Sequence, residues 1–434
     1  MVKKSRGIHH FFADDPERAD WETWGRRSDP TTRRGFVKGL GAFTALVGAR
    51  VAFADQVPAG LVPASHANET SPFEIEGKDG LTLLNDRPLN AETPPHLLND
   101  DVTPANRLFI RNNGIPPENV DPSSWTLTLD GESVTRETTY TIRDLREKFE
   151  NVDRQLVLEC GGNGRSEFNP PVSGNQWTLG AVGCPQWNGV RLKDVLEDCG
   201  YEQDAVYVAF YAADTHISGA ADRIPISRGV PIEKAIDDES MIAFGMNGHD
   251  LHEMNGHPLR LVLGGWPGSA SGKWINRVSI RDRVHDGPKM ASPSYRVPCE
   301  PVAPGQSVED EDMCIIHAMP VKSLITYPQS GIKHSSKESL PLHGHAWSGD
   351  TNISKLRISI DYGRTWDSAK LQRPSNRLAW QNWDHTVRFP TSGYYEIWAC
   401  AEDALGHSQP MVLPSWNPKG YLNNACHRIA VYVS

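Results

Sequence analysis

The hydrophobic pattern divides the chain into a mixed first part and a second part made of strands. In residues 104–283, short apolar strands alternate with brief helices. Residues 125–129 and 206–211 have strand patterns, and the apolar positions of residues 192–199 have helical spacing. This mixture predicts an α+β domain over residues 104–283.

From residue 315 onward, every element that the pattern predicts is a strand. Residues 356–360 and 429–433 alternate apolar and polar side chains, and residues 394–399 precede Cys400 as a further strand. Turn sequences such as Ser348-Gly349-Asp350 separate these strands at intervals of roughly ten residues. The pattern therefore predicts an all-β, immunoglobulin-like sandwich over residues 315–434.

Two segments lack any clear apolar period. Residues 55–103 are rich in Pro, Asn and Asp, which indicates an extended lead-in that wraps the first domain. Residues 284–314 are rich in Pro, Gly, Asp and Glu, and we interpret them as a linker between the two domains.

The N-terminal residues 1–54 have the features of an export signal. The sequence Thr32-Arg33-Arg34-Gly35-Phe36-Val37-Lys38 is typical of a twin-arginine signal, and an apolar run ends at Ala52-Phe53-Ala54. Arg50 interrupts that run, which is too short for a membrane anchor. We expect cleavage after Ala54, export to the periplasm and no anchor in the mature chain. Because this pathway carries folded proteins, a cofactor inserted in the cytoplasm is also expected.

Charge argues against nucleic acid as a partner. The 434 residues carry a formal net charge of −10, and removal of the basic signal segment would make the protein more acidic. An acidic protein binds polyanions poorly but suits a basic partner protein.

One of the seven cysteines has the setting of a metal ligand. Cys160 follows the apolar run Leu156-Val157-Leu158 and precedes two glycines and Arg165, so a thiolate could approach a bulky metal centre there. The chain contains no C-x-x-C and no C-x-x-C-H motif for covalent haem, and we expect no haem in it. Cys400 and Cys426 lie on the last two predicted strands and could form a disulfide, or remain two separate buried thiols.

Several ordered motifs resemble those of one family. The sequence Cys160-Gly161-Gly162-Asn163-Gly164-Arg165 is similar to the C-A-G-N-R-R motif of the animal members of that family. Further similar segments lie at residues 109–113, 177–181, 244–248, 258–265, 272–274 and 422–428. From about Pro104 to the C-terminus, the chain resembles the sulfite oxidase family of molybdenum-cofactor enzymes. The resemblance implies a molybdopterin-binding domain followed by an immunoglobulin-like dimerisation domain, and hence a homodimer.

The resemblance also implies the residues of the site. Cys160 would bind molybdenum, and the implied catalytic residues are Arg111, Cys160, Arg165, Trp177, Tyr295 and Arg428. The implied residues for the molybdopterin are Phe109, Ile110, Arg111, Asn112, Asn113, Cys160, Asp214, Asn255, Arg260, Ser271, Gly272 and Lys273. This chain departs from the animal members at Asn113 and Asn255, where they have His, and at Gly164, where they have Arg.

The resemblance implies a periplasmic sulfite dehydrogenase that passes electrons to a separate acceptor, such as a c-type cytochrome. Two alternatives stay open. A sulfane dehydrogenase subunit of thiosulfate oxidation shares the fold, although Arg165 favours sulfite. A non-enzymatic exported β-sandwich binding protein would also have an export signal and a sandwich. A plant-type nitrate reductase fits less well, because such enzymes also contain haem and flavin domains.

Overall fold

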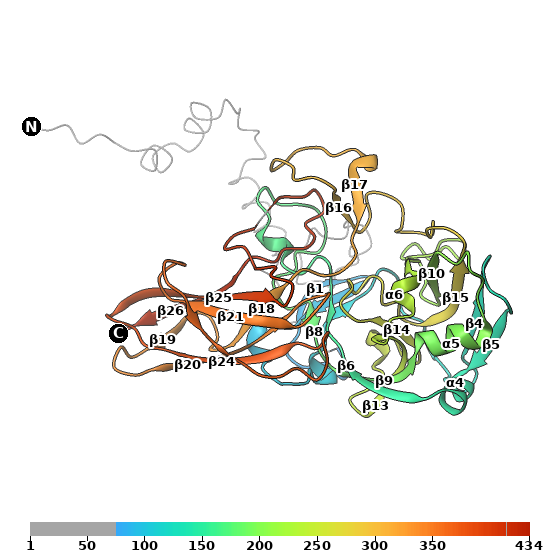
Figure 1. Cartoon of the computed structure of the whole chain (residues 1–434), viewed down its shortest axis with the longest axis horizontal. Helices are drawn as coiled ribbons and strands as arrows, with labels where there is room; N and C mark the ends of the chain where they lie inside the picture. Colours follow the sequence, from blue (N-terminus) through green and yellow to red (C-terminus); the bar gives the residue numbers. More distant parts are fainter. Residues whose placement is uncertain (1–74, 414) are drawn as a thin grey trace, which may run out of the picture. The chain divides into compact units, whose positions relative to one another are not determined.

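The computed structural model describes residues 75–413 and 415–434 of the chain (Figure 1). The predicted signal peptide, residues 1–54, and the first part of the lead-in lie outside the described residues. Within the described ranges, no helix is long and apolar enough to cross a membrane.

The lead-in pairs with the start of the first domain. One three-stranded antiparallel sheet is formed by β1 (Thr82–Asp86), β2 (Leu89–Glu92) and β3 (Ile110–Arg111). Asn90 lies opposite Arg111 in this sheet, and its side-chain oxygen accepts a 2.8 Å hydrogen bond from the backbone N–H of Asn112. The lead-in thereby fixes the backbone from which Arg111 projects.

Two larger sheets share the core of the first domain. In spatial order, the first consists of β11 (Gly229–Pro231), β10 (Tyr207–Ala212), β15 (Ile275–Arg281), β4 (Thr126–Asp130) and β5 (Thr138–Thr141). The second consists of β13 (His249–Asp250), β12 (Ser240–Met246), β9 (Gln186–Arg191) and β6 (Asn151–Gln155), with β14 (Arg260–Leu263) paired to β12. Phe210 and Leu129 of the first sheet and Ile242 of the second belong to one hydrophobic core.

The α-helices among the described residues are short. They are α4 (Ile142–Lys148), α5 (Leu192–Cys199) and α6 (Ile232–Ala235). The 3₁₀ helices are η3 (Pro95–Leu97), η4 (Ala105–Arg107), η5 (Arg165–Glu167), η6 (Glu253–Asn255) and η7 (Asp310–Asp312). A capping box between Thr141 and Asp144 starts α4, and α5 occupies the residues for which helical spacing was predicted. The first domain therefore contains more strand and less helix than the predicted α+β class suggests.

Two sheets make up the last part of the chain. One consists of β18 (Lys322–Tyr327), β20 (Leu340–Trp347), β24 (Gln381–Val387) and β23 (Lys370–Leu371). The other consists of β19 (Ile332–His334), β26 (His427–Val433), β25 (Gly393–Asp403), β21 (Ile353–Ser359) and β22 (Asp367–Ser368) (Figure 1). Leu342 and Trp383 of the first sheet pack in one core with Ile397 and Ile429 of the second. Two sheets around one core agree with the predicted sandwich, whereas its immunoglobulin-like topology stays a prediction.

Residues 284–314 are more ordered than the predicted linker. β16 (Arg296–Pro298) pairs with β17 (Met313–Ile315), and a disulfide joins Cys299 to Cys314. Tyr295, just before β16, is 7% exposed. The buried residues of this segment are isolated among prolines and acidic residues and follow no period. The hydrophobic pattern of the sequence therefore could not predict its strands.

Cys400 and Cys426 are free thiols, so the structure does not contain the disulfide considered from the sequence. Their strands β25 and β26 are neighbours, as that prediction required. The two thiols contact through a hydrogen bond, which lowers the pKa of Cys400. Cys400 Sγ also lies 3.4 Å from the carbonyl oxygen of Gln409. These polar contacts give both thiols hydrogen-bond partners in the reduced state.

Buried histidines of the last domain predict acid sensitivity. Burial lowers the pKa of His345, whose ring stacks on Trp380 at 3.8 Å, from 6.5 to about 4. An unfolded chain with histidine pKa near 6.5 binds the proton that the folded chain excludes, so stability falls as pH decreases from about 6.5 towards 4. We expect His345 to contribute up to about 3 kcal/mol to this loss at pH 4.

The measurement is urea unfolding of wild type and of the variant His345→Gln at several pH values in this window. The variant should lose less stability than wild type on acidification. His249→Gln, at an exposed position, serves as the control. Identical pH profiles for wild type and His345→Gln would contradict the assignment.

Candidate active site

Cys160 lies at the end of a buried strand and opens into a pocket. β7 (Leu158–Glu159) pairs with β8 (Val182–Gly183), and the backbone N–H of Cys160 donates to Ala181 O at 2.9 Å. Gly162 follows, and a Cβ at that position would come within 2.4 Å of the Arg165 guanidinium. The glycine is therefore needed for this turn to pack against Arg165.

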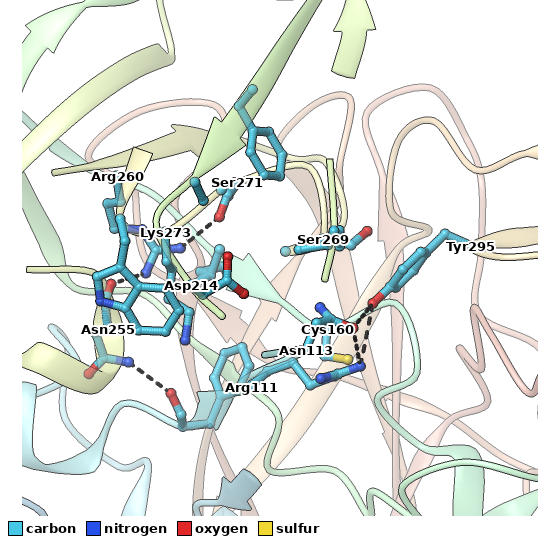
Figure 2. Close-up of a pocket in the computed structure, with 18 residues that line it drawn as sticks. Arg111, Asn113, Cys160, Asp214, Asn255, Arg260, Ser269, Ser271, Lys273 and Tyr295 are labelled. Atoms are coloured by element: carbon cyan, nitrogen blue, oxygen red, sulfur yellow. Dashed lines mark hydrogen bonds between the residues drawn. The ribbon is translucent and has the colours of Figure 1, made fainter. Parts of the chain in front are cut away.

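The pocket lies between these elements, and side chains from both larger sheets and from the loops around Cys160 line it (Figure 2). Most of the residues that the resemblance implied line it: Phe109, Arg111, Asn113, Cys160, Asp214, Asn255, Arg260, Ser271, Gly272, Lys273 and Tyr295. Gly272 packs face to face with Phe210, whose ring would lie 2.4 Å from an added Cβ. A side chain at position 272 would thus collide with the Phe210 ring, which also lines the pocket.

One end of the pocket gathers buried cations. Arg260 is 2% exposed and donates to carbonyl oxygens, including Asn255 O at 2.7 Å. Burial lowers its pKa to about 9, and burial with repulsion from Arg260 lowers the pKa of Lys273 well below its usual value. Lys78 donates to Asn255 Oδ1 at 2.5 Å, and burial with the same repulsion lowers its pKa to about 7. A bound phosphate would offset this positive charge.

Beside these cations, two acceptors lack partners. Asp214 Oδ1 and Ser269 Oγ are buried in the pocket wall without a hydrogen bond. Burial raises the pKa of Asp214 to about 6. The N–H groups of a pterin would satisfy these atoms, since unpaired buried polar groups are costly. The residues present therefore fit molybdopterin: the cations around Lys273 would hold its phosphate, and Cys160 would hold the metal.

The other end of the pocket combines Cys160 with one guanidinium and one phenol. Arg111 and Cys160 both line this end, and Arg111 Nη2 donates to Asn113 Oδ1 at 2.9 Å and to the Tyr295 hydroxyl at 3.4 Å. The Tyr295 hydroxyl in turn donates to Asn113 Oδ1 at 3.1 Å (Figure 2). Tyr295 has φ of 50°, a region that non-glycine residues seldom adopt outside functional sites. An oxyanion beside Cys160 would meet these donors.

Five residues that the resemblance implied do not line the pocket: Ile110, Asn112, Arg165, Trp177 and Arg428. Trp177 is fully buried with its ring edge against Phe109, at a centroid distance of 6.4 Å. Asn112 does not line the pocket itself, but its side-chain oxygen accepts a hydrogen bond from Lys273, which does. Ile110 is fully buried in β3.

Arg165 and Arg428 are absent from the pocket lining for different reasons. Arg165 Nε donates to Lys419 O and its Nη1 to Asn175 O, both at 2.9 Å. Two of its guanidinium donors are therefore bound by backbone carbonyl oxygens. Arg428 is exposed, and its guanidinium lies 5.7 Å from the Trp398 ring on β25. Successive side chains of a strand face opposite sides, and the buried neighbour is His427. Arg428 therefore points away from the pocket.

The structure adds residues that the sequence analysis did not select. Lys78 and Ser269 belong to the pocket region, and Tyr421 stacks on Tyr295 with ring centroids 5.7 Å apart. Lys78 lies in the lead-in among Gly and Asp, where nothing in the sequence distinguishes it from a surface lysine. The tyrosine pair joins residues 126 positions apart, which only the fold brings together.

The last domain supports the Cys160 turn through four contacts. Leu422 N–H donates to Gly161 O, and Asn423 Nδ2 to Gly164 O, both at 2.9 Å. A buried ion pair joins Lys322 of β18 to Glu159, the residue before Cys160, at 2.5 Å. The Glu159 carboxylate also accepts a hydrogen bond from Trp347 Nε1 at 2.9 Å and another from Asn163 Nδ2 at 3.0 Å.

Comparisons with known proteins agree with this arrangement. The family description "Oxidoreductase molybdopterin binding domain" matches residues 113–289, and "Mo-co oxidoreductase dimerisation domain" matches residues 313–434. Mitochondrial sulfite oxidase of Homo sapiens is 32% identical over 368 residues, which cover 82% of this chain and 66% of the human protein. Sulfite oxidase of Gallus gallus is 32% identical, with 80% of this chain and 77% of that protein covered.

Two more distant similarities extend the comparison. A nitrate reductase [NAD(P)H] of Hordeum vulgare is 29% identical, over 81% of this chain and 42% of that protein. The solved structure of the sulfane dehydrogenase SoxCD from Paracoccus pantotrophus is similar with a TM-score of 0.65 and 24% identity. That match covers 88% of this chain and 91% of the other, and it supports the fold alone.

Proposed function

Because the chain belongs to the sulfite oxidase family of molybdenum-cofactor oxidoreductases, we propose that it oxidises sulfite to sulfate. The observation that carries this proposal is the pairing of Cys160 with Arg111 and Tyr295 at one end of a pocket whose other end is cationic. A molybdenum–molybdopterin group bound there would supply oxygen transfer and accept the electrons. In the balanced reaction, sulfite and water give sulfate, two protons and two electrons.

The protein's own part is binding and orientation. Arg111, which is half-buried, and the Tyr295 hydroxyl would hold the oxyanion beside Cys160, where the guanidinium supplies positive charge. Lys78, Arg260 and Lys273 would hold the cofactor phosphate, and Asp214 the pterin edge. Cys160 would supply the thiolate ligand, which soft metal centres favour.

Further parts of the proposal concern the cell. The predicted twin-arginine signal supports export to the periplasm, and the net charge of −10 suits a basic c-type cytochrome as one-electron acceptor. The dimerisation family that matches residues 313–434 supports a homodimer through the last domain.

Elemental analysis and a substrate assay test the proposed function. We expect about one molybdenum per chain and sulfite-dependent reduction of a c-type cytochrome. The assay should also include a sulfane substrate, because Arg165, which favoured sulfite in the sequence, does not line the pocket. Protein without molybdenum, or turnover of the sulfane substrate alone, would contradict the proposal.

A further inference from the structure

Arg228 is a buried cation that lacks an acidic partner. It lies just before β11 and is 1% exposed. Its Nη1 makes one long hydrogen bond, 3.3 Å to Lys289 O, and its Nε has no partner. Besides burial, the groups among the described residues that shift its pKa are three tyrosines, which are neutral phenols, and Arg296, with no carboxylate among them. A buried guanidinium in this state is costly, so a role beyond packing is expected.

The side chain of Arg228 faces the pocket wall. Its guanidinium carbon lies 4.7 Å from the centre of the Tyr295 ring, and Tyr295 lines the pocket. Ile226, two residues earlier, also lines the pocket, whereas Ser227 between them turns the other way and hydrogen-bonds Phe210 O and His285. Arg228 thus occupies the pocket side of its segment.

Arg228 is one end of a four-layered stack. Tyr295 packs on Tyr421 with an interplanar angle of 18°, and the Arg165 guanidinium lies 5.0 Å from the centre of the Tyr421 ring. The order is therefore Arg228, Tyr295, Tyr421 and Arg165. Both guanidinium groups can favour the ring faces. Only Arg165 is also satisfied by well-formed hydrogen bonds to carbonyl oxygens.

We propose that Arg228 is a positioning residue for the oxyanion: it holds the Tyr295 ring from behind and supplies uncompensated positive charge to the Cys160 end of the pocket. The inference rests on the proposed function for the identity of the oxyanion. Arg111 contacts the Tyr295 hydroxyl and Arg228 lies against the Tyr295 ring, so a dianion bound beside this tyrosine would be close to two positive charges.

The test uses molybdenum-loaded protein, so that the cofactor occupies the Lys273 end. The variants are Arg228→Met, which can still pack on Tyr295, and Arg228→Lys, which keeps the charge. Arg281→Met is the matched control, because Arg281 is also buried but is paired with Glu132 at 2.7 Å. Each protein is melted with and without sulfate, the unreactive product, and its KM and kcat for sulfite are measured.

We expect Arg228→Met to melt no lower than wild type without sulfate, because an unpaired buried charge is removed, and to lose at least half of the sulfate-induced rise in Tm. Its KM for sulfite should rise about tenfold while kcat changes less than about threefold. Arg228→Lys should recover most of both effects. Arg281→Met should melt lower and keep the full response to sulfate.

The opposite pattern would overturn the inference. If Arg228→Met melts lower than wild type but keeps its sulfate response and its KM, Arg228 only packs against Tyr295. The proposed function is tested independently of this inference, and it is contradicted if the wild-type protein does not oxidise sulfite. Loss of the sulfate response in Arg228→Met would still support an anion-positioning role in that case.

Discussion

The variant Cys160→Ser is expected to fold and to lose sulfite oxidation by more than about 100-fold. Replacing groups that merely orient a metal ligand already costs 10–100-fold in many enzymes, and a hydroxyl is a poor ligand for a soft metal centre. Cys160 is only 7% exposed and lies in the pocket, so its hydroxyl replacement changes the site chemistry with little change in volume. The measurements are the rate with sulfite and the molybdenum content of the purified protein.

Cys184→Ser is the matched control for this loss. Cys184 is also a buried free thiol, but it lies outside the pocket and its Sγ accepts from the backbone N–H of Trp380 at 3.5 Å. A serine hydroxyl can accept the same hydrogen bond, and this variant should keep most of the activity. Equal losses in the two variants would attribute the effect to general damage, and a wild-type rate in Cys160→Ser would remove Cys160 from the chemistry.

Lys322→Met is expected to have the largest effect on stability, about 3–5 kcal/mol of unfolding free energy. The ammonium group and the Glu159 carboxylate are 5% and 1% exposed, and removal of one leaves the other charged and buried. The double variant Glu159→Gln/Lys322→Gln should recover most of the loss, because neutral amides can hydrogen-bond without the desolvation cost of two charges. Urea unfolding of both single variants and the double variant gives the coupling energy.

Lys193→Met provides the comparison at the surface. Lys193 pairs with Asp238, whose side chain is 64% exposed, and the loss of such a solvent-screened pair should cost much less stability than the loss of the buried pair. If Lys322→Met were equally mild, or if the double variant were as unstable as the sum of the single ones, the buried pair would not be coupled as the structure indicates.

Local pattern predicted the regular elements well because burial on one face leaves a period in the sequence. The helical spacing of residues 192–199 is α5, and the run 206–211 overlaps β10. The pocket-lining set around Cys160 and Lys273 came from motif resemblance, since its residues lie in loops that carry no period. Neither the hydrophobic pattern nor the motif resemblance identified Lys78, Arg228 and Tyr421, because no period and no recognised motif includes them.

Side-chain direction is the part of the site that the sequence predicts least well. The motif placed Arg428 near the C-terminal strand, but whether it faces the pocket depends on the register of β26, in which a shift of one residue reverses the facing side. The motif places Arg165 in the turn after Cys160, but its donors bind the carbonyl oxygens of Asn175 and of Lys419, which is 254 residues later. A single sequence does not specify such long-range partners.

The dependence of the Cys160 turn on the last domain has a consequence for biosynthesis. Glu159 is held by Lys322, 163 residues later, and Gly164 by Asn423, 259 residues later. On the ribosome, those partners emerge long after the turn itself. The pocket therefore reaches its final form only after the C-terminal strands have been translated and have packed against the first domain. Insertion of the cofactor then follows completion of the chain. A nascent chain that lacks these strands cannot take up the cofactor.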